Sequence, residues 1–106
     1  MSETPNLNYF NAIAGDDAQL LQRLITIAKE EFPTEKQGFL TAFQTPDYPK
    51  AAEAVHKIKH KINIFGLDNG YQIAVRFENE LRQEKTQSYS DFLGILEQIE
   101  TYLTAI

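Results

Sequence analysis

Residues 54–66, AVHKIKHKINIFG, contain the pattern on which the predicted fold rests. Their apolar side chains recur at i, i+3, i+7 and i+10, the spacing of one face of an α-helix. These side chains are Val55, Ile58, Ile62 and Phe65. Gly66 follows and is expected to end the helix. At about 100° per residue, His56 falls roughly opposite the apolar face. The segment therefore predicts an amphipathic helix with an exposed histidine.

Helical spacing also continues upstream of this segment. A short helix is expected over Tyr9 to Ala14, and Asp16 is a suitable N-cap for the next one. Pro33 suits the first turn of a further helix. Asp47 and Pro49 then open the helix that contains the histidine. Each start is marked by a residue that favours the beginning of a helix.

Two more helices are expected downstream. The first carries an apolar face of Tyr71, Ala74, Phe77 and Leu81, and the last starts near Ser88 or Ser90. No segment shows the alternation typical of a strand. Since short connections make neighbouring helices antiparallel, we expect an all-α, up-and-down antiparallel four-helix bundle with a short additional N-terminal helix.

The bulk composition predicts one intracellular domain. A length of 106 residues fits a single domain over 1–106, of which polar residues 1–8 are expected to form a flexible N-terminal segment. The absence of cysteine excludes disulfides and thiolate metal sites. We expect no signal peptide, because the start lacks a basic region followed by an apolar run. No apolar stretch approaches the roughly 20 residues of a membrane span, so a cytoplasmic protein is expected.

The charge is unevenly distributed along the chain. A net charge of −5 argues against a general nucleic-acid binder and against docking on an anionic membrane. Near the two histidines, however, the only acidic residue is Glu53, and four lysines are present: Lys50, Lys57, Lys59 and Lys61. The sequence therefore predicts a local cationic patch around His56 and His60.

His56 is the leading candidate for chemistry. A neutral imidazole is a competent nucleophile, and this one is expected to project into water. Lys59, three residues on, shares its face of the helix. A phosphoryl group on the ring would bring negative charge that the Lys59 ammonium can stabilise.

The segment 54–66 resembles the signature of histidine-containing phosphotransfer (HPt) domains. That signature reads His, any residue, Leu, Lys, Gly, with a further Gly closing the helix ten residues after the His. His56 matches the phosphorylated histidine, and Ile58 stands in for the Leu. Lys59 matches the supporting lysine, and Gly66 matches the closing glycine.

Two further stretches resemble the same family. Residues 73–78 are similar to its next-helix pattern, which ends in an apolar residue and Glu. Residues 13–16, followed by Leu20 and Leu21, resemble its usual start. The likeness covers nearly the whole chain in order and spacing, which makes the combination more specific than any single motif.

The resemblance implies a defined role. An HPt domain does not use ATP, and it passes phosphoryl groups between aspartates of receiver domains. The expected partners are receiver domains of response regulators and hybrid histidine kinases. No cofactor is expected on this chain, because the assisting magnesium belongs to the receiver. Independently of the resemblance, a monomer is expected because the predicted helices have polar outer faces. His56 would be the phosphoryl acceptor and Lys59 its electrostatic support, while Glu78 or Arg82 could contact the imidazole or the partner.

A docking surface is expected around the histidine, made by Lys57, His60, Lys61, Asn63 and Ile64. For Ile64, packing against the next helix is an equal alternative. The sequence departs from the family pattern at His60, where Gly is usual, and more mildly at Gly70, where an apolar residue is commoner. His60 could narrow the approach to His56, orient it, interact with the phosphoryl group, or mark a module that only binds.

Three other functions need to be compared with the residues. His56 and His60, spaced i, i+4, could hold a metal ion with Glu53, but neighbouring lysines oppose a cation and no metal is expected. A degenerate HPt-like bundle could bind signalling partners without transferring phosphate. Hydrolytic catalysis is disfavoured because no nucleophile elbow can be recognised.

Overall fold

The computed structural model describes residues 3–106. Within this range it contains five α-helices and no strand, so the predicted all-α class is confirmed. The helices are α1 (Asn8–Ala14), α2 (Ala18–Gln44), α3 (Tyr48–Ile64), α4 (Asp68–Arg82) and α5 (Tyr89–Ala105). None of these helices is long and apolar enough to cross a membrane.

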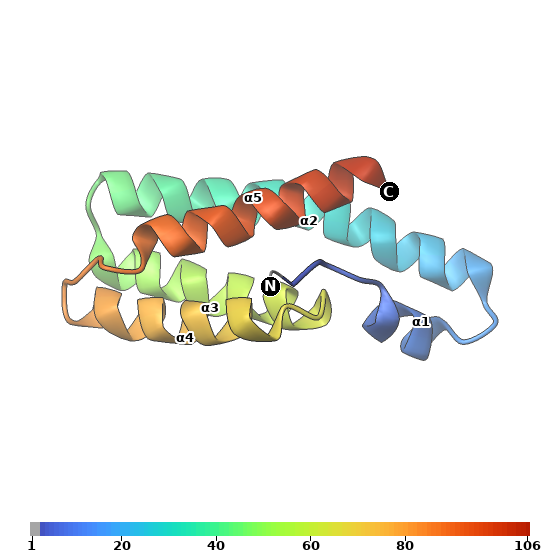
Figure 1. Cartoon of the computed structure of the whole chain (residues 1–106). Coiled ribbons are helices and arrows are strands. Elements are labelled where there is room, and N and C mark those ends of the chain that lie inside the picture. The colour runs from blue at the N-terminus through green and yellow to red at the C-terminus, as the bar shows by residue number, and fades with distance from the viewer. Residues whose placement is uncertain (1–2) are drawn as a thin grey trace.

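The four long helices lie side by side, and the chain reverses direction from each to the next (Figure 1). α3 packs against both α2 and α4, while α5 packs against α4 and α2. Short α1 lies beyond the bundle and contacts α2. Because the loops between the long helices are short, each helix must return along its predecessor. One side of α3 thus remains outside these helix contacts.

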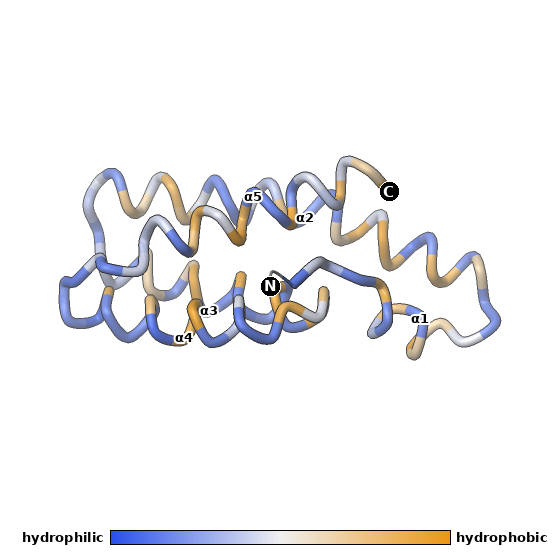
Figure 2. Tube along the Cα trace, in the orientation of Figure 1, coloured by the Kyte–Doolittle hydropathy of each residue, from blue (hydrophilic) through white to orange (hydrophobic). Residues whose placement is uncertain are grey.

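The core is built from the apolar faces of the long helices (Figure 2). The predicted apolar face of α3 is fully buried along its length. Phe39, Phe77 and Phe92 join α2, α4 and α5, with ring centroids 5.1–5.8 Å apart. Such aromatic pairs add about 0.5–1.5 kcal/mol each beyond area burial. This packing fixes how α4 lies against α2 and α5.

The prediction of a new helix at Pro33 is wrong, because Pro33 lies inside α2, a single continuous helix of 27 residues. Pro33 is exposed and removes one helical hydrogen bond, which costs about 3 kcal/mol in a helix interior. The buried residues on α2 keep one heptad phase across the proline: Ile25, Ala28, Phe32, Phe39 and Ala42. Packing on both sides of Pro33 therefore holds the two halves in one helix.

The predicted N-cap of α2 is shifted by one residue. Asp17, not Asp16, caps the helix, and its carboxylate accepts a hydrogen bond of 2.9 Å from the Leu20 amide. Gly15 has φ +57°, so the turn after α1 uses Gly15 and Asp16 before the chain becomes extended at Asp17. At α3, Asp47 is the N-cap as predicted, and it accepts from the Lys50 amide at 3.1 Å.

The N-terminal segment, for which the sequence predicted flexibility, makes specific contacts from residue 3 onward; residues 1 and 2 lie outside the described range. The Glu3 carboxylate accepts from the amides of Asn69 and Gly70 at 2.9 and 3.0 Å. It thereby caps α4, which has no side-chain cap of its own. The Asn6 amide donates to the Phe65 carbonyl at 2.9 Å. Orphan backbone groups at the α3–α4 turn thus anchor the segment.

Replacing Gly66 by alanine should destabilise the fold. Gly66 has φ +78°, and a Cβ at this position would collide with the side-chain amide of Asn6. Both the left-handed backbone and the collision disfavour a side chain, so we expect Gly66→Ala to lower the free energy of unfolding by about 1–3 kcal/mol. Urea denaturation measures this difference.

Gly94→Ala is the matched control. Gly94 lies within α5, and a Cβ there would meet no atom within 4 Å. Alanine should therefore raise the free energy of unfolding by about 0.5–1 kcal/mol, because it favours the helix more than glycine does. A Gly66→Ala protein as stable as the parent would contradict the role given to this turn.

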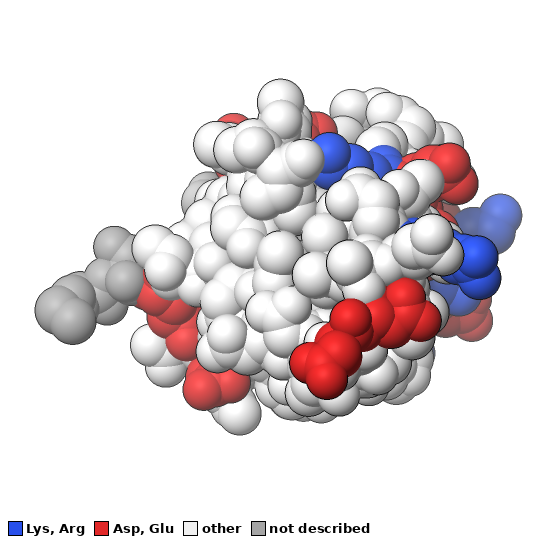
Figure 3. Space-filling view, turned by 90° about the vertical axis from the view of Figure 1, so that its right-hand side faces the viewer, with Lys and Arg blue, Asp and Glu red and all other residues white. Residues whose placement is uncertain are grey.

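Charged side chains are sparse at the α1 end of the molecule. Figure 3 views that end, and most of the visible face carries neither acidic nor basic groups. On α1, Tyr9 and Ile13 are each 50% exposed, so the helix buries only part of its apolar surface. The titratable groups that could support chemistry lie elsewhere, on α3 and α4.

Candidate functional site

His56 projects from the exposed side of α3, as the helical spacing predicted. Its side chain is 51% exposed, whereas Val55 and Ile58 on the same helix are fully buried. The contrast follows from the rotation of about 100° per residue. Packing of α3 in the core therefore fixes the direction in which the imidazole points.

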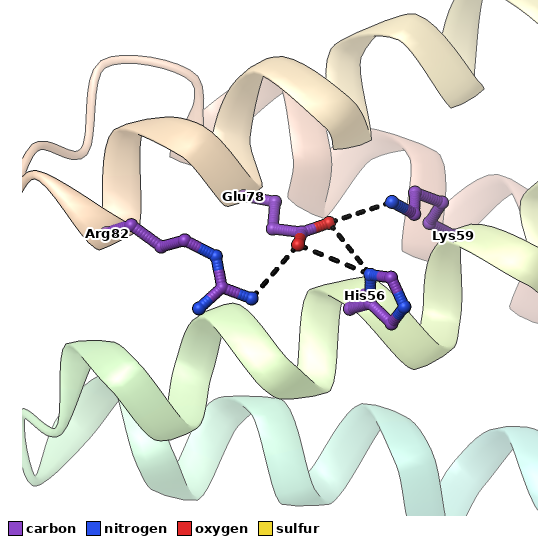
Figure 4. Close-up of polar contacts among 4 residues, drawn as sticks. All are labelled: His56, Lys59, Glu78 and Arg82. Carbon is purple, nitrogen blue, oxygen red and sulfur yellow. Dashed lines mark hydrogen bonds and ion pairs between the residues drawn. The ribbon is translucent and has the colours of Figure 1, made fainter.

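The Glu78 carboxylate of α4 gathers three side chains around it (Figure 4). His56 Nδ1 lies 3.3 Å from both carboxylate oxygens. Lys59 Nζ donates to Oε1 at 3.0 Å, and Arg82 Nη2 donates to Oε2 at 3.1 Å. One carboxylate thus links the histidine, the lysine one turn further along α3, and an arginine on its own helix.

Glu78 is one of two polar residues in the described part of the chain that are buried, at 8% exposure. Burial alone would raise the pKa of its carboxyl. Hydrogen bonds from Lys59 and Arg82, the charge of Lys59 and the contact with His56 outweigh this and lower the pKa. Glu78 is consequently a carboxylate at neutral pH, and its charge is compensated by Lys59 and Arg82.

An ionised carboxylate only accepts hydrogen bonds. We therefore infer that His56 carries its proton on Nδ1 and donates it to Glu78. The second ring nitrogen, Nε2, then has a free lone pair and points away from Glu78 (Figure 4). This arrangement holds at the surface an oriented imidazole whose free lone pair is chemically able to act as a nucleophile.

Lys59 lies beside this nucleophile but is largely covered, with a side-chain exposure of 13%. One of its three N–H groups serves Glu78, which leaves two donors for another acceptor. His60 lies on the other side and is exposed. Its ring centroid is 5.3 Å from that of His56, and the two rings are almost perpendicular, at 87°. The structure thus brings His56, Lys59 and His60 together.

A family model described as Hpt domain matches residues 14–106. The chain belongs to the HPt domain family. No curated protein and no solved structure gave a match. HPt domains serve phosphotransfer in two-component signalling, as carriers rather than kinases, and they interact with receiver domains.

The remaining predicted docking residues of this HPt domain occupy different surroundings. Lys57 and Asn63 are exposed, and Asn63 lies two turns from His56 on the same face of α3. Ile64 is half-buried and packs against the core, which is the boundary position that the sequence left as an alternative. Lys57 therefore extends the exposed surface toward α2, and Asn63 extends it along α3.

Lys61 does not join the surface around His56. Its ammonium lies 2.9 Å from Glu31 and 3.1 Å from Glu35, both on α2. Burial alone would lower the pKa of Lys61, but the hydrogen bonds and charges of the two glutamates outweigh it and raise the pKa. Since Lys59 is also paired, the predicted cationic patch is reduced by neighbouring acids that the linear sequence does not show.

Glu78 and Arg82 are the residues whose role the sequence left undecided. A signal was present, because Glu78 follows Ala74 by four residues and therefore falls on the apolar face of α4. Arg82 follows by another four. A glutamate on a buried face needs a partner, and α3 supplies it.

Among the described residues, no group of three or more histidine, cysteine, aspartate or glutamate side chains could hold a metal ion. His56 and His60 are close, but Nδ1 of His56 already contacts Glu78. The residues around the pair, Lys57 and Lys59, are cationic. The positive charge around the two histidines thus favours the binding of an anion over that of a cation.

The lowered pKa of Glu78 predicts loss of stability in acid. A carboxyl whose pKa is lower in the folded than in the unfolded state adds stability above its ordinary value of 4.5, and this is lost as pH falls through the lowered pKa. Unfolding free energies measured from about pH 7 to pH 3 should thus fall more steeply for the parent than for Glu78→Gln. Parallel curves would contradict the folded-state pKa shift.

Proposed function

We propose that this HPt domain is a phosphorelay intermediate. It accepts a phosphoryl group on His56 from the aspartate of one receiver domain and passes it to the aspartate of another. The observation that carries the proposal is the exposed imidazole whose Nδ1 contacts the buried Glu78 carboxylate. In this proposal the four long helices form an up-and-down bundle that presents His56 on the outer side of α3.

The transfer step uses the free nitrogen of the ring. The Nε2 lone pair attacks the phosphorus of the receiver's aspartyl phosphate, the N–P bond forms, and the P–O bond to the aspartate breaks. The aspartate leaves as a carboxylate with the bonding electron pair. The imidazole keeps its Nδ1 proton and becomes positively charged, and Glu78 at 3.3 Å stabilises that charge. Reversal of these bonds delivers the phosphoryl group to the second receiver.

Lys59 supports the phosphoryl group electrostatically. Its ammonium remains hydrogen-bonded to Glu78 and has donors left for a phosphoryl oxygen. We expect no cofactor on this chain, and the magnesium that assists transfer is expected on the receiver domain. The negative charge on the phosphoryl oxygens is thus met by Lys59 on one side and by the receiver on the other.

The docking surface for the receiver surrounds His56 and comprises Lys57, His60, Asn63 and the exposed part of Ile64. Lys61, also predicted there, lies outside this surface, in the ion pairs that hold α3 against α2. Weak docking suits a relay, because each receiver must leave after transfer. Lys57 gives this surface an exposed positive charge that attracts the acidic side chains expected around a receiver's aspartate.

A binding module without transfer is the second candidate. The observation that favours it is His60, which places an imidazole at the position next to His56 where the family signature has glycine. This reading predicts that receivers bind, that binding survives His56→Gln, and that no phosphate moves.

The test is transfer from a panel of phosphorylated receiver domains to the purified protein. The product expected is a phosphohistidine, which is acid-labile and alkali-stable. Transfer from at least one receiver, with release to a second, supports the relay. Binding by receivers in a complete cognate set without any transfer would replace the relay by the binding module.

A further inference from the structure

We propose that His60 is a second phosphoryl-binding residue, whose ring N–H donates to an oxygen of the phosphoryl group carried by His56. This inference rests on the proposed phosphorylation of His56. It assigns to His60 a contact with the transferred group itself, beyond a place in the docking surface.

The geometry of the two rings supports this contact. His60 lies one turn along α3 from His56, so both side chains leave the helix on the same side. Their centroids are 5.3 Å apart, and the edge-to-face arrangement leaves the rings unstacked. Nδ1 of His56 is taken by Glu78, so a phosphoryl group must be attached at Nε2, away from Glu78. That is the exposed side of α3, which His60 shares.

Lys59 alone leaves part of the phosphoryl group unpartnered. A phosphoryl group offers three strong acceptor oxygens. Lys59 is mostly covered and already donates to Glu78, so it approaches from the α4 side of the site. His60 approaches from the exposed side. Two donors of different residues can therefore hold two of the oxygens, while the third stays open to the receiver.

His60 is available for this role. Within residues 3–106 it takes part in none of the ion pairs, whereas His56, Lys59 and Arg82 all contact Glu78. Its position beside His56 limits the rotamers it must give up on binding. A ring donor that contacts no acid and lies beside the reacting ring is therefore free to donate to the new anion.

The experiment loads His56 with phosphoramidate, a small phosphoryl donor that needs no receiver. Parent, His60→Gln and His60→Leu are compared, and Gln72→Leu, an exposed position of α4, controls for a polar-to-leucine change. Two quantities are measured: the ring proton and nitrogen NMR signals of His60 before and after loading, and the half-life of the phosphohistidine. Thermal unfolding verifies that each variant is folded.

On loading, a ring proton of His60 should become protected from exchange and move downfield. Loss of a charge-assisted hydrogen bond should shorten the half-life roughly three- to tenfold in His60→Leu, while the Gln amide keeps it within about twofold. Unchanged His60 signals and equal half-lives would overturn the inference. Loading without transfer to any receiver would overturn the relay and leave this contact standing, and failure of His56 to load would overturn both.

Discussion

Replacing His56 by glutamine is expected to abolish phosphoryl acceptance while the domain stays folded. The glutamine amide has no basic lone pair on nitrogen, so it cannot form the N–P bond. Lys59 and His60 remain in His56→Gln. The Lys59 ammonium has no lone pair and already donates to Glu78, and among residues 3–106 no ion pair holds the His60 ring as Glu78 holds His56. Transfer from any phosphorylated receiver should fall to background.

The same substitution should change stability little. The His56 side chain is half exposed, and Glu78 keeps its bonds to Lys59 and Arg82 when the imidazole is removed. We therefore expect a change of less than about 1 kcal/mol in the free energy of unfolding. Transfer and urea denaturation, measured on one preparation, separate loss of the nucleophile from loss of the fold.

His60→Gln is the matched control, because it makes the same change one turn away. It should still accept phosphate. Transfer lost in His60→Gln and kept in His56→Gln would show that the acceptor has been assigned to the wrong histidine. Transfer lost in both would mean that the two rings act as a unit.

The sequence was sufficient for α3 and for the exposure of His56. Four apolar residues at helical spacing define the buried side of that helix, and His56 lies opposite them whatever helix packs there. The start of α3 was equally local, since Asp47 caps the helix through its own i+3 amide. Features set by residues within a few turns of one another could be predicted.

Pro33 shows where local rules fail. A proline favours the first turn of a helix, and this preference pointed to a break. The structure keeps α2 continuous because Phe32 and Phe39, on either side, bury 99% and all of their surface in the same core. The unbroken heptad phase was visible in the sequence. How much its apolar residues stabilise a continuous helix depends, however, on their packing against three other helices.

The ion-pair partners of charged residues could also not be predicted from the sequence. Lys59 and Lys61 are two residues apart, yet one pairs with α4 and the other with α2. The acidic residue that each lysine contacts depends on how far neighbouring helices are shifted along their axes relative to one another. The spacing of residues within one helix does not determine this shift. For the same reason Glu78 and Arg82 could be named but not assigned, although Glu78 organises the site.

Glu78→Ala should have the second-largest effect, on both acceptance and stability. Without the carboxylate, the largely covered Lys59 ammonium loses its partner and Arg82 loses its contact. We expect the free energy of unfolding to fall by about 2–3 kcal/mol, somewhat less than for a fully enclosed pair because Lys59 can still reach water. A domain of this size withstands such a loss, so the variant can be assayed folded at low temperature.

Acceptance should fall because the imidazole loses its orientation and its tautomeric preference. By analogy with other histidines whose second nitrogen is held by a carboxylate, the initial rate of phosphoryl acceptance should fall roughly 10- to 100-fold in Glu78→Ala. The phosphoramidate reaction measures this rate without involving a receiver. An unchanged rate would show that the contact at 3.3 Å does not prepare His56 for attack.

Glu78→Gln separates the two contributions of the carboxylate. The amide oxygen can still accept the hydrogen bond from Nδ1–H, so the tautomer is retained, but the negative charge that stabilises the developing imidazolium is lost. We expect a rate between those of the parent and Glu78→Ala. A Gln variant as slow as Ala would assign the effect to charge, and one as fast as the parent would assign it to orientation. Both outcomes keep Glu78 as a positioning residue, which acts on the phosphoryl group through His56.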